Sequence, residues 1–183
     1  LFNHIEELDQ PEFGSYFKDF LEIMAVRYAE GRLFTEEDML KKYGDIPVYA
    51  FNFVDYILWK NREELGRKYK GVKFDHFKFA YRRSIEHWFP QHPNSDEKIE
   101  KMDDQFLHSF GNLCIITDSQ NSKFGNLVPS AKYKQWEGIF DRQSLKLQIM
   151  ANITEKTKWE SYQIKGLEKE ILPMVNRFIE SKS

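Results

Sequence analysis

The chain has 183 residues with 27 basic and 29 acidic side chains, so its formal net charge at pH 7 is −2. This balance excludes a uniformly basic nucleic-acid-binding protein but allows a local basic face. The single cysteine, Cys114, excludes an internal disulfide framework and a zinc site built from several thiolates. No apolar run reaches about 18 residues and no basic segment precedes an apolar one, so neither a transmembrane helix nor a secretory signal is predicted.

Helical spacing dominates residues 1–76. Apolar side chains recur at helical steps between Phe13 and Met24, and Thr35 precedes three acidic residues as a helix N-cap does. Pro47 can open a further helix whose solvated end would be Lys60–Lys70. We therefore expect residues 1–76 to form a helical lead-in. Because the chain starts at a leucine rather than a methionine, we also expect it to be a piece of a longer chain.

The spacing changes in the centre of the chain. Phe77, Phe79 and Tyr81 alternate with more polar residues, which predicts a strand. Asn112–Thr117 reads as a short buried strand, and a short helix is expected over 120–124.

The C-terminal part returns to helical spacing. Pro129 permits a helix start, and apolar residues from Trp136 to Leu147 continue a helical face. In the last helix, with core positions from Ile164 to Phe178, Pro173 should cause a kink or a split. The predicted fold is α+β and mostly α-helical: one compact domain with a central unit over 77–132 and a helical segment over 133–183.

Two stretches of the centre contain side chains suited to chemistry. His87 lies where a strand would end and Pro90 begins a turn, so its imidazole can reach a cleft while its backbone stays fixed. Asn112, Asn121 and Asn126 recur around a strand of four apolar residues, where an amide usually bonds the backbone or holds a side chain. Both features also have ordinary explanations: a histidine at a strand end, and asparagines as turn formers or helix caps.

Together the two stretches resemble the HNH, or ββα-metal, nuclease core, in which a strand delivers a catalytic histidine and a short helix returns a metal ligand. His87-Trp88-Phe89-Pro90 matches the His-x-x-Pro signature of the C-terminal domain of GmrSD-type restriction endonucleases. Gly111-Asn112-Leu113, Asn121 and Lys132 resemble that family's second block. Asn112 to Pro129 is also similar to the HNH domain of RNA-guided CRISPR nucleases. The resemblance covers about 84–132 and implies a small ββα-metal core between helical flanks.

The resemblance implies a role for each matching residue. His87 would be the general base that takes a proton from water, and Asn112 would accept the imidazole N–H and fix the ring. Asn121 and Glu86 would hold a divalent metal, Mg²⁺ or Mn²⁺, because amide and carboxylate oxygens are hard ligands. His108 and Asn126 are reserve candidates, with a bystander role for His108 as the alternative.

Glu86 meets a geometric objection. Neighbouring side chains on a regular strand point to opposite faces, so Glu86 and His87 can address one metal only if the strand ends or bulges there. The alternative is that Glu86 is a solvated or salt-bridged carboxylate.

The charge distribution indicates a local basic face. Residues 60–83 contain nine basic and three acidic side chains, a net charge of +6, directly before His87. Arg82, Arg83, Lys123 and Lys132 flank the expected site and could contact phosphates, or could simply solvate helix ends.

The resemblance implies a metal-dependent DNA endonuclease domain that hydrolyses phosphodiester bonds. It would be the C-terminal part of a modification-dependent restriction or phage-defence protein in the bacterial or archaeal cytoplasm. Relatives carry an N-terminal ParB-like nucleotide-hydrolysing domain, and no membrane partner is expected. Two alternatives stay open: a non-catalytic DNA- or protein-binding module that keeps the nuclease fold, and an RNA-cleaving toxin domain.

Overall fold

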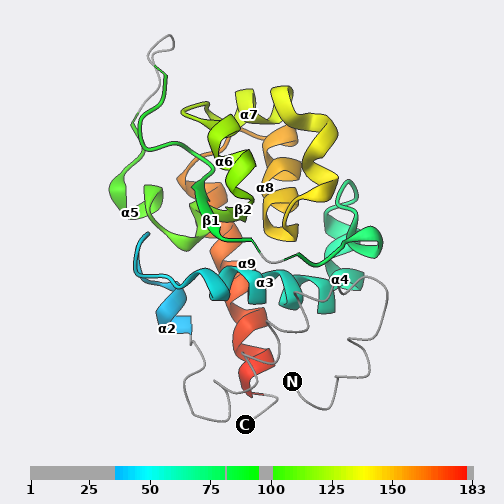
Figure 1. Cartoon of the computed structure of the whole chain (residues 1–183). Coiled ribbons are helices and arrows are strands. Elements are labelled where there is room, and N and C mark those ends of the chain that lie inside the picture. The colour runs from blue at the N-terminus through cyan, green and yellow to red at the C-terminus, as the bar shows by residue number, and fades with distance from the viewer. Residues whose placement is uncertain (1–35, 81, 95–100, 181–183) are drawn as a thin grey trace.

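The computed structural model describes residues 36–80, 82–94 and 101–180. Helices surround one small sheet, so the predicted mostly α-helical α+β class is confirmed (Figure 1). The strands are β1 (Ser84–His87) and β2 (Leu113–Ile116). The α-helices are α2 (Glu36–Met39), α3 (Val48–Lys60), α4 (Arg62–Lys68), α5 (Asp104–Leu107), α6 (Asp118–Phe124), α7 (Pro129–Trp136), α8 (Leu145–Lys156) and α9 (Ser161–Glu180). The 3₁₀ turns are η2 (Phe74–His76), η3 (Phe110–Asn112) and η4 (Glu137–Arg142).

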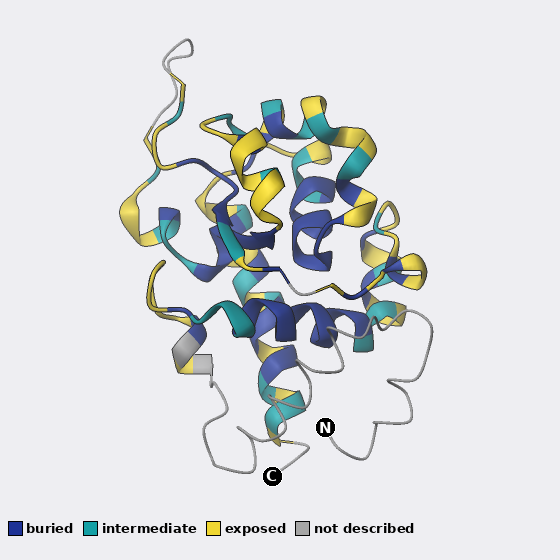
Figure 2. Cartoon of the chain, viewed as in Figure 1, coloured by how far each residue is buried: buried dark blue, intermediate teal, exposed yellow. Residues whose placement is uncertain are grey.

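The hydrophobic core lies between the sheet and three helices. Helix α3 contacts α8, α9 and β2, and α8 also packs on β2 (Figure 1). Figure 2 shows α3, β2 and most of α8 in the colour of buried residues, whereas α9 is buried on one side only. All ten residues from Ala50 to Trp59 are buried, so α3 is a core helix enclosed on every side rather than an amphipathic surface helix. None of the helices within the described ranges is long and apolar enough to cross a membrane.

The strand predicted around Phe77, Phe79 and Tyr81 is wrong for residues 77–80, and Tyr81 lies outside the described residues. The alternation is real, since Phe77 and Phe79 are buried while Lys78 and Ala80 are exposed, but Phe79 makes only an isolated bridge and the ladder of β1 begins at Ser84. Apolar alternation shows which side chains face the core, whereas a strand also requires a neighbouring backbone with which to pair. The buried strand expected over Asn112–Thr117 is confirmed as β2, in slightly shorter form.

Several predicted helix boundaries are confirmed. Helix α3 has Pro47 as its N-cap, and α7 has Pro129 in its first turn. Helix α9 continues through Pro173 from Ser161 to Glu180, so the expected split does not occur. The helical face expected from Trp136 to Leu147 is interrupted, because η4 ends at Arg142 and a new helix, α8, begins after its N-cap Ser144. The predictions for Phe13–Met24 and Thr35 fall outside the described residues.

Candidate active site around His87

The two strands form a regular antiparallel pair that decides where each side chain of β1 points. Glu86 pairs with Cys114 and His87 with Leu113, without a bulge. Side chains alternate between the faces of a strand, so Ser84 and Glu86 share one face while His87 points to the other. The regular register therefore separates Glu86 from His87.

The His87 imidazole lies in a polar and aromatic cluster at the end of β1. Its Nε2 is 3.1 Å from Nδ1 of His108, and its Nδ1 is 3.3 Å from the amide nitrogen of Gln91. The Tyr43 ring lies against it with a centroid separation of 4.5 Å. Tyr43 is itself tied to this place, because its backbone N–H donates to the His108 carbonyl at 2.9 Å. The three neighbouring side chains therefore enclose the imidazole, and His87 is only 5% exposed.

This environment keeps the imidazole neutral. Burial, with smaller effects of His108 and the nearby Lys132 ammonium, lowers the pKa of His87 to about 4. With the Gln91 amide N–H donating to Nδ1, the neutral ring carries its proton on Nε2 and donates it to His108. A water molecule can therefore reach a ring nitrogen only by replacing Gln91 or His108.

Lys132 holds the backbone that carries His87. Its side chain is fully buried, and Nζ donates to Oε1 of Glu86 at 2.6 Å, to the His87 carbonyl at 2.7 Å and to the Trp88 carbonyl at 3.0 Å. These contacts use all three ammonium protons. The prediction that Lys132 contacts phosphate is therefore wrong, because the ammonium has no surface to offer and no proton left to donate.

Glu86 is the buried partner of this lysine. Burial raises the pKa of the Glu86 carboxyl and lowers that of the Lys132 ammonium, and the attraction between the two groups opposes both shifts. The salt-bridged alternative for Glu86 is thus the arrangement found. Lys132 needs a carboxylate because an unpaired ammonium in this position would lose its hydration without compensation.

Asn112 clamps the chain just beyond His87. Its Oδ1 accepts the Phe89 N–H at 2.9 Å and the Trp159 indole N–H at 3.0 Å, and its Nδ2 donates to the carbonyls of Phe89 and Leu107 at 3.1 and 2.9 Å. The amide has no capacity left for the imidazole. The predicted Asn112–His87 ring contact is wrong, because a fully buried amide is satisfied first by backbone groups.

Asn121 lies at the opposite end of β1 from His87. It is exposed on α6 and its Nδ2 is 3.3 Å from Oγ of Ser84, which also contacts Asp118 at 3.0 Å. The structure therefore does not bring Asn121 together with Glu86 or His87. Across the described ranges, no three or more His, Cys, Asp or Glu side chains are grouped to hold a metal ion. Glu86 is bound by Lys132 and Asn121 lies beside Ser84, so the described contacts do not assemble the Glu86–Asn121 site that the resemblance implies.

The remaining predicted contacts are dispersed. Arg83 is exposed and pairs with Asp118 at 3.3 Å, and Lys123 is exposed with its ammonium 5.9 Å from the Trp136 ring centroid. Asn126 is exposed, and its carbonyl accepts the Asn94 N–H at 3.2 Å. Arg82 is buried, so the alternative that it simply solvates a helix end is wrong. Its guanidinium bonds the carbonyls of Ala80 and Arg142, at 3.1 and 3.0 Å.

Three neighbours of His87 receive no primary role from the sequence. His108 is only a reserve candidate there, and Tyr43 and Gln91 are not singled out. Gln91 follows His87 by four residues within the same short segment, which is a detectable signal. Tyr43 reaches the site only through the packing of a distant loop, so no local pattern could have found it.

Comparisons with known proteins identify the family of this chain. The family model described as GmrSD restriction endonucleases, C-terminal domain, matches residues 35–173. Searches of curated proteins and of solved structures return no match.

Proposed function

We propose that this chain, which belongs to the family of C-terminal domains of GmrSD restriction endonucleases, hydrolyses phosphodiester bonds in DNA with His87 as general base. The observation that carries the proposal is the His87 imidazole at the end of β1, on a backbone segment that Lys132 and Asn112 hold in place. The pKa of His87 lies below neutral pH, so the ring is neutral and its Nδ1 can take a proton from water once Gln91 is displaced.

The chain's own residues position this base. Lys132 holds the carbonyls of His87 and Trp88, and Asn112 clamps both backbone groups of Phe89. Such contacts keep a catalytic group oriented before the substrate arrives. Substrate binding would replace Gln91 with the attacking water at Nδ1, the ring nitrogen that carries no proton. The proton of that water passes to the imidazole as its oxygen bonds to phosphorus and the ester oxygen leaves.

The dependence on Mg²⁺ or Mn²⁺ is part of the proposal and comes from the resemblance to HNH nucleases. A divalent ion would supply charge stabilisation for the phosphoryl group. Because Glu86 and Asn121 do not meet, we assign the ion no ligands in this chain and no step of the reaction. The role in modification-dependent restriction or phage defence, beside a ParB-like N-terminal domain and in the bacterial or archaeal cytoplasm, is likewise proposed from the family.

A plasmid-nicking assay tests the proposal. The full-length protein is incubated with supercoiled DNA and Mg²⁺ or Mn²⁺, and the His87→Ala variant is compared with the wild type. His92→Ala is the matched control, because His92 is an exposed histidine five residues away. Removing a general base lowers the rate by about 10²- to 10⁴-fold, and the control should stay within about twofold. A His87→Ala variant that nicks at the wild-type rate would exclude the proposed base.

A second candidate is a non-catalytic DNA-binding module, because both ring nitrogens of His87 already have protein partners. Wild-type protein that binds the plasmid but does not nick it with either metal would favour this function. Cleavage of an RNA substrate in a parallel assay, without nicking of the plasmid, would favour a toxin instead.

A further inference from the structure

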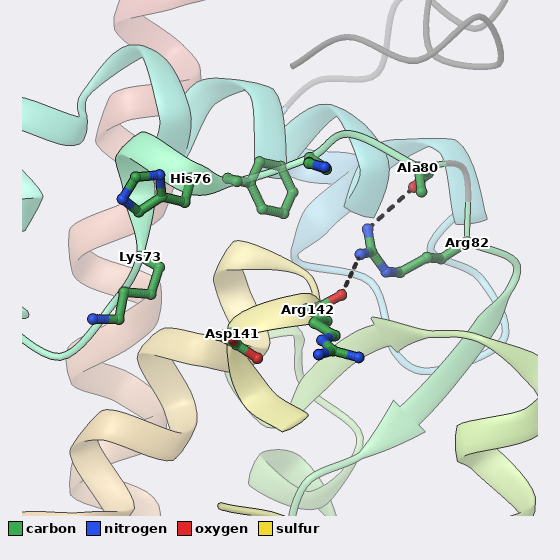
Figure 3. Close-up of a pocket in the computed structure, with 8 residues that line it drawn as sticks. Lys73, His76, Ala80, Arg82, Asp141 and Arg142 are labelled. Atoms are coloured by element: carbon green, nitrogen blue, oxygen red, sulfur yellow. Dashed lines mark hydrogen bonds between the residues drawn. The ribbon is translucent and has the colours of Figure 1, made fainter. Parts of the chain in front are cut away.

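A second concave site lies away from His87, beside the segment that leads into β1. A pocket of about 560 Å³ opens between residues 73–80, Arg82 and η4 (Figure 3). In Figure 3, Lys73 and His76 stand on one side and Arg82 on the other, and Asp141 and Arg142 lie between them. Its volume is in the range of pockets that hold small organic molecules, and it is larger than a lone inorganic anion requires.

The polar lining of this pocket is predominantly cationic. Four cations, Lys73, Lys78, Arg82 and Arg142, and one carboxylate, Asp141, are among its lining residues. Within the part of the chain that the structure describes, the side chains of Lys73, Lys78 and Arg142 have no ion-pair partner. Their charges are therefore not used to stabilise the fold and are available to an anionic ligand.

Arg82 supplies a buried and fixed charge at the base of the pocket. It is 4% exposed, and its two terminal nitrogens are anchored on the carbonyls of Ala80 and Arg142. Asp55 lies 3.9 Å away, at the limit of an ion pair, and the Arg82 Nε–H has no acceptor. A guanidinium that is held by carbonyls and only loosely paired keeps a positive potential in a region of low dielectric.

We propose that this pocket binds the phosphate of a nucleotide unit, supplied either by a nucleic-acid strand or by a free nucleotide. The cations attract the phosphate, and the Lys and Arg side chains can donate to its oxygens. The Asp141 carboxylate can accept hydrogen bonds but cannot donate them, so it favours a ligand that also carries an O–H or N–H group. A nucleotide has such groups on its sugar or base, whereas a bare phosphate at neutral pH offers little for Asp141.

The position of the pocket suits a strand that also reaches His87. Arg82 precedes His87 by five residues, so their backbones are at most about 17 Å apart. That distance corresponds to about five nucleotides along one strand of a duplex. The proposal that a nucleic-acid strand supplies the phosphate rests on the proposed nuclease function, whereas binding of a free nucleotide does not.

Binding to a fluorescently labelled oligonucleotide tests the pocket without cleavage. The full chain with His87→Ala is used throughout, and the pocket variant also carries Lys73→Gln and Lys78→Gln. The control carries Lys101→Gln and Lys169→Gln, two exposed lysines outside the pocket, so its net charge changes equally. We expect the dissociation constant, measured by anisotropy, to rise at least tenfold for the pocket variant and less than twofold for the control. If oligonucleotide binding weakens equally in the pocket variant and the control, or weakens in neither, the pocket does not bind a nucleic-acid strand.

Calorimetry with a nucleoside 5′-monophosphate identifies the source. Saturable binding to the protein that the pocket variant loses and the control retains supports a free nucleotide. Binding of the oligonucleotide alone, with the same dependence, supports a strand. If neither probe distinguishes the two variants, the pocket proposal is wrong, while loss of nicking in His87→Ala would still support the nuclease. Circular dichroism of each variant verifies that the fold is retained.

Discussion

The buried ammonium of Lys132 gives the sharpest test of how the site is held. Replacing it in Lys132→Met leaves the Glu86 carboxylate buried without its partner and removes the donor to the His87 and Trp88 carbonyls. Breaking a buried ion pair on one side costs about 3–5 kcal/mol. We therefore expect the free energy of unfolding to fall by about 3–5 kcal/mol, which is a large part of the stability of an ordinary domain.

Urea unfolding followed by tryptophan fluorescence measures this loss. Lys134→Met, two residues further along α7 and exposed, is the matched control and should change stability by less than about 0.5 kcal/mol. Glu86→Gln combined with Lys132→Met should recover part of the loss, because the variant then buries no unpaired charge. A Lys132→Met protein within about 1 kcal/mol of the wild type would refute the assignment of Lys132 as the holder of this segment.

Three further predictions concern residues around the site. Burial lowers the pKa of His87 from 6.5 to about 4, so the unfolded chain binds a proton on this histidine more readily than the folded chain does. The stability that depends on a neutral His87 is therefore complete above pH 6.5 and is lost as the pH falls towards 4. Unfolding of the wild type and of His87→Gln across this range should reveal a relative loss of about 3 kcal/mol in the wild type, and parallel curves would contradict the pKa. Asn112→Ala should lower the free energy of unfolding in urea by about 3 kcal/mol and slow nicking, because the Phe89 N–H and the Trp159 indole N–H lose their acceptor. A stable and fully active variant would show that Asn112 does not hold this segment. Gly111→Ala should cost about 2 kcal/mol or more, because the added Cβ meets the Ile164 carbonyl and lies 2.7 Å from its Cγ2, whereas Gly138→Ala meets nothing within 4 Å and should be nearly neutral in thermal unfolding.

The sequence located the candidate site better than it assigned the roles within it. His87, Asn112 and Lys132 all stand out in short motifs, and the structure does place the three in one network around the end of β1. The predicted partners of Asn112 and Lys132, the His87 ring and a phosphate, were wrong. Both motifs are compatible with several contacts, and the register of β1 with β2 and the packing of α7 decide which contact forms.

Local chemistry determined what the sequence could predict by itself. Pro47 and Pro129 begin helices because a proline at a helix start loses no hydrogen bond, and the apolar run at Leu113–Ile116 forms a strand that is buried on all sides. The tertiary structure alone decided that Lys132 and Arg82 are buried. A charged side chain leaves water only where distant segments supply acceptors for it, and no spacing of residues along the chain records where those segments will meet.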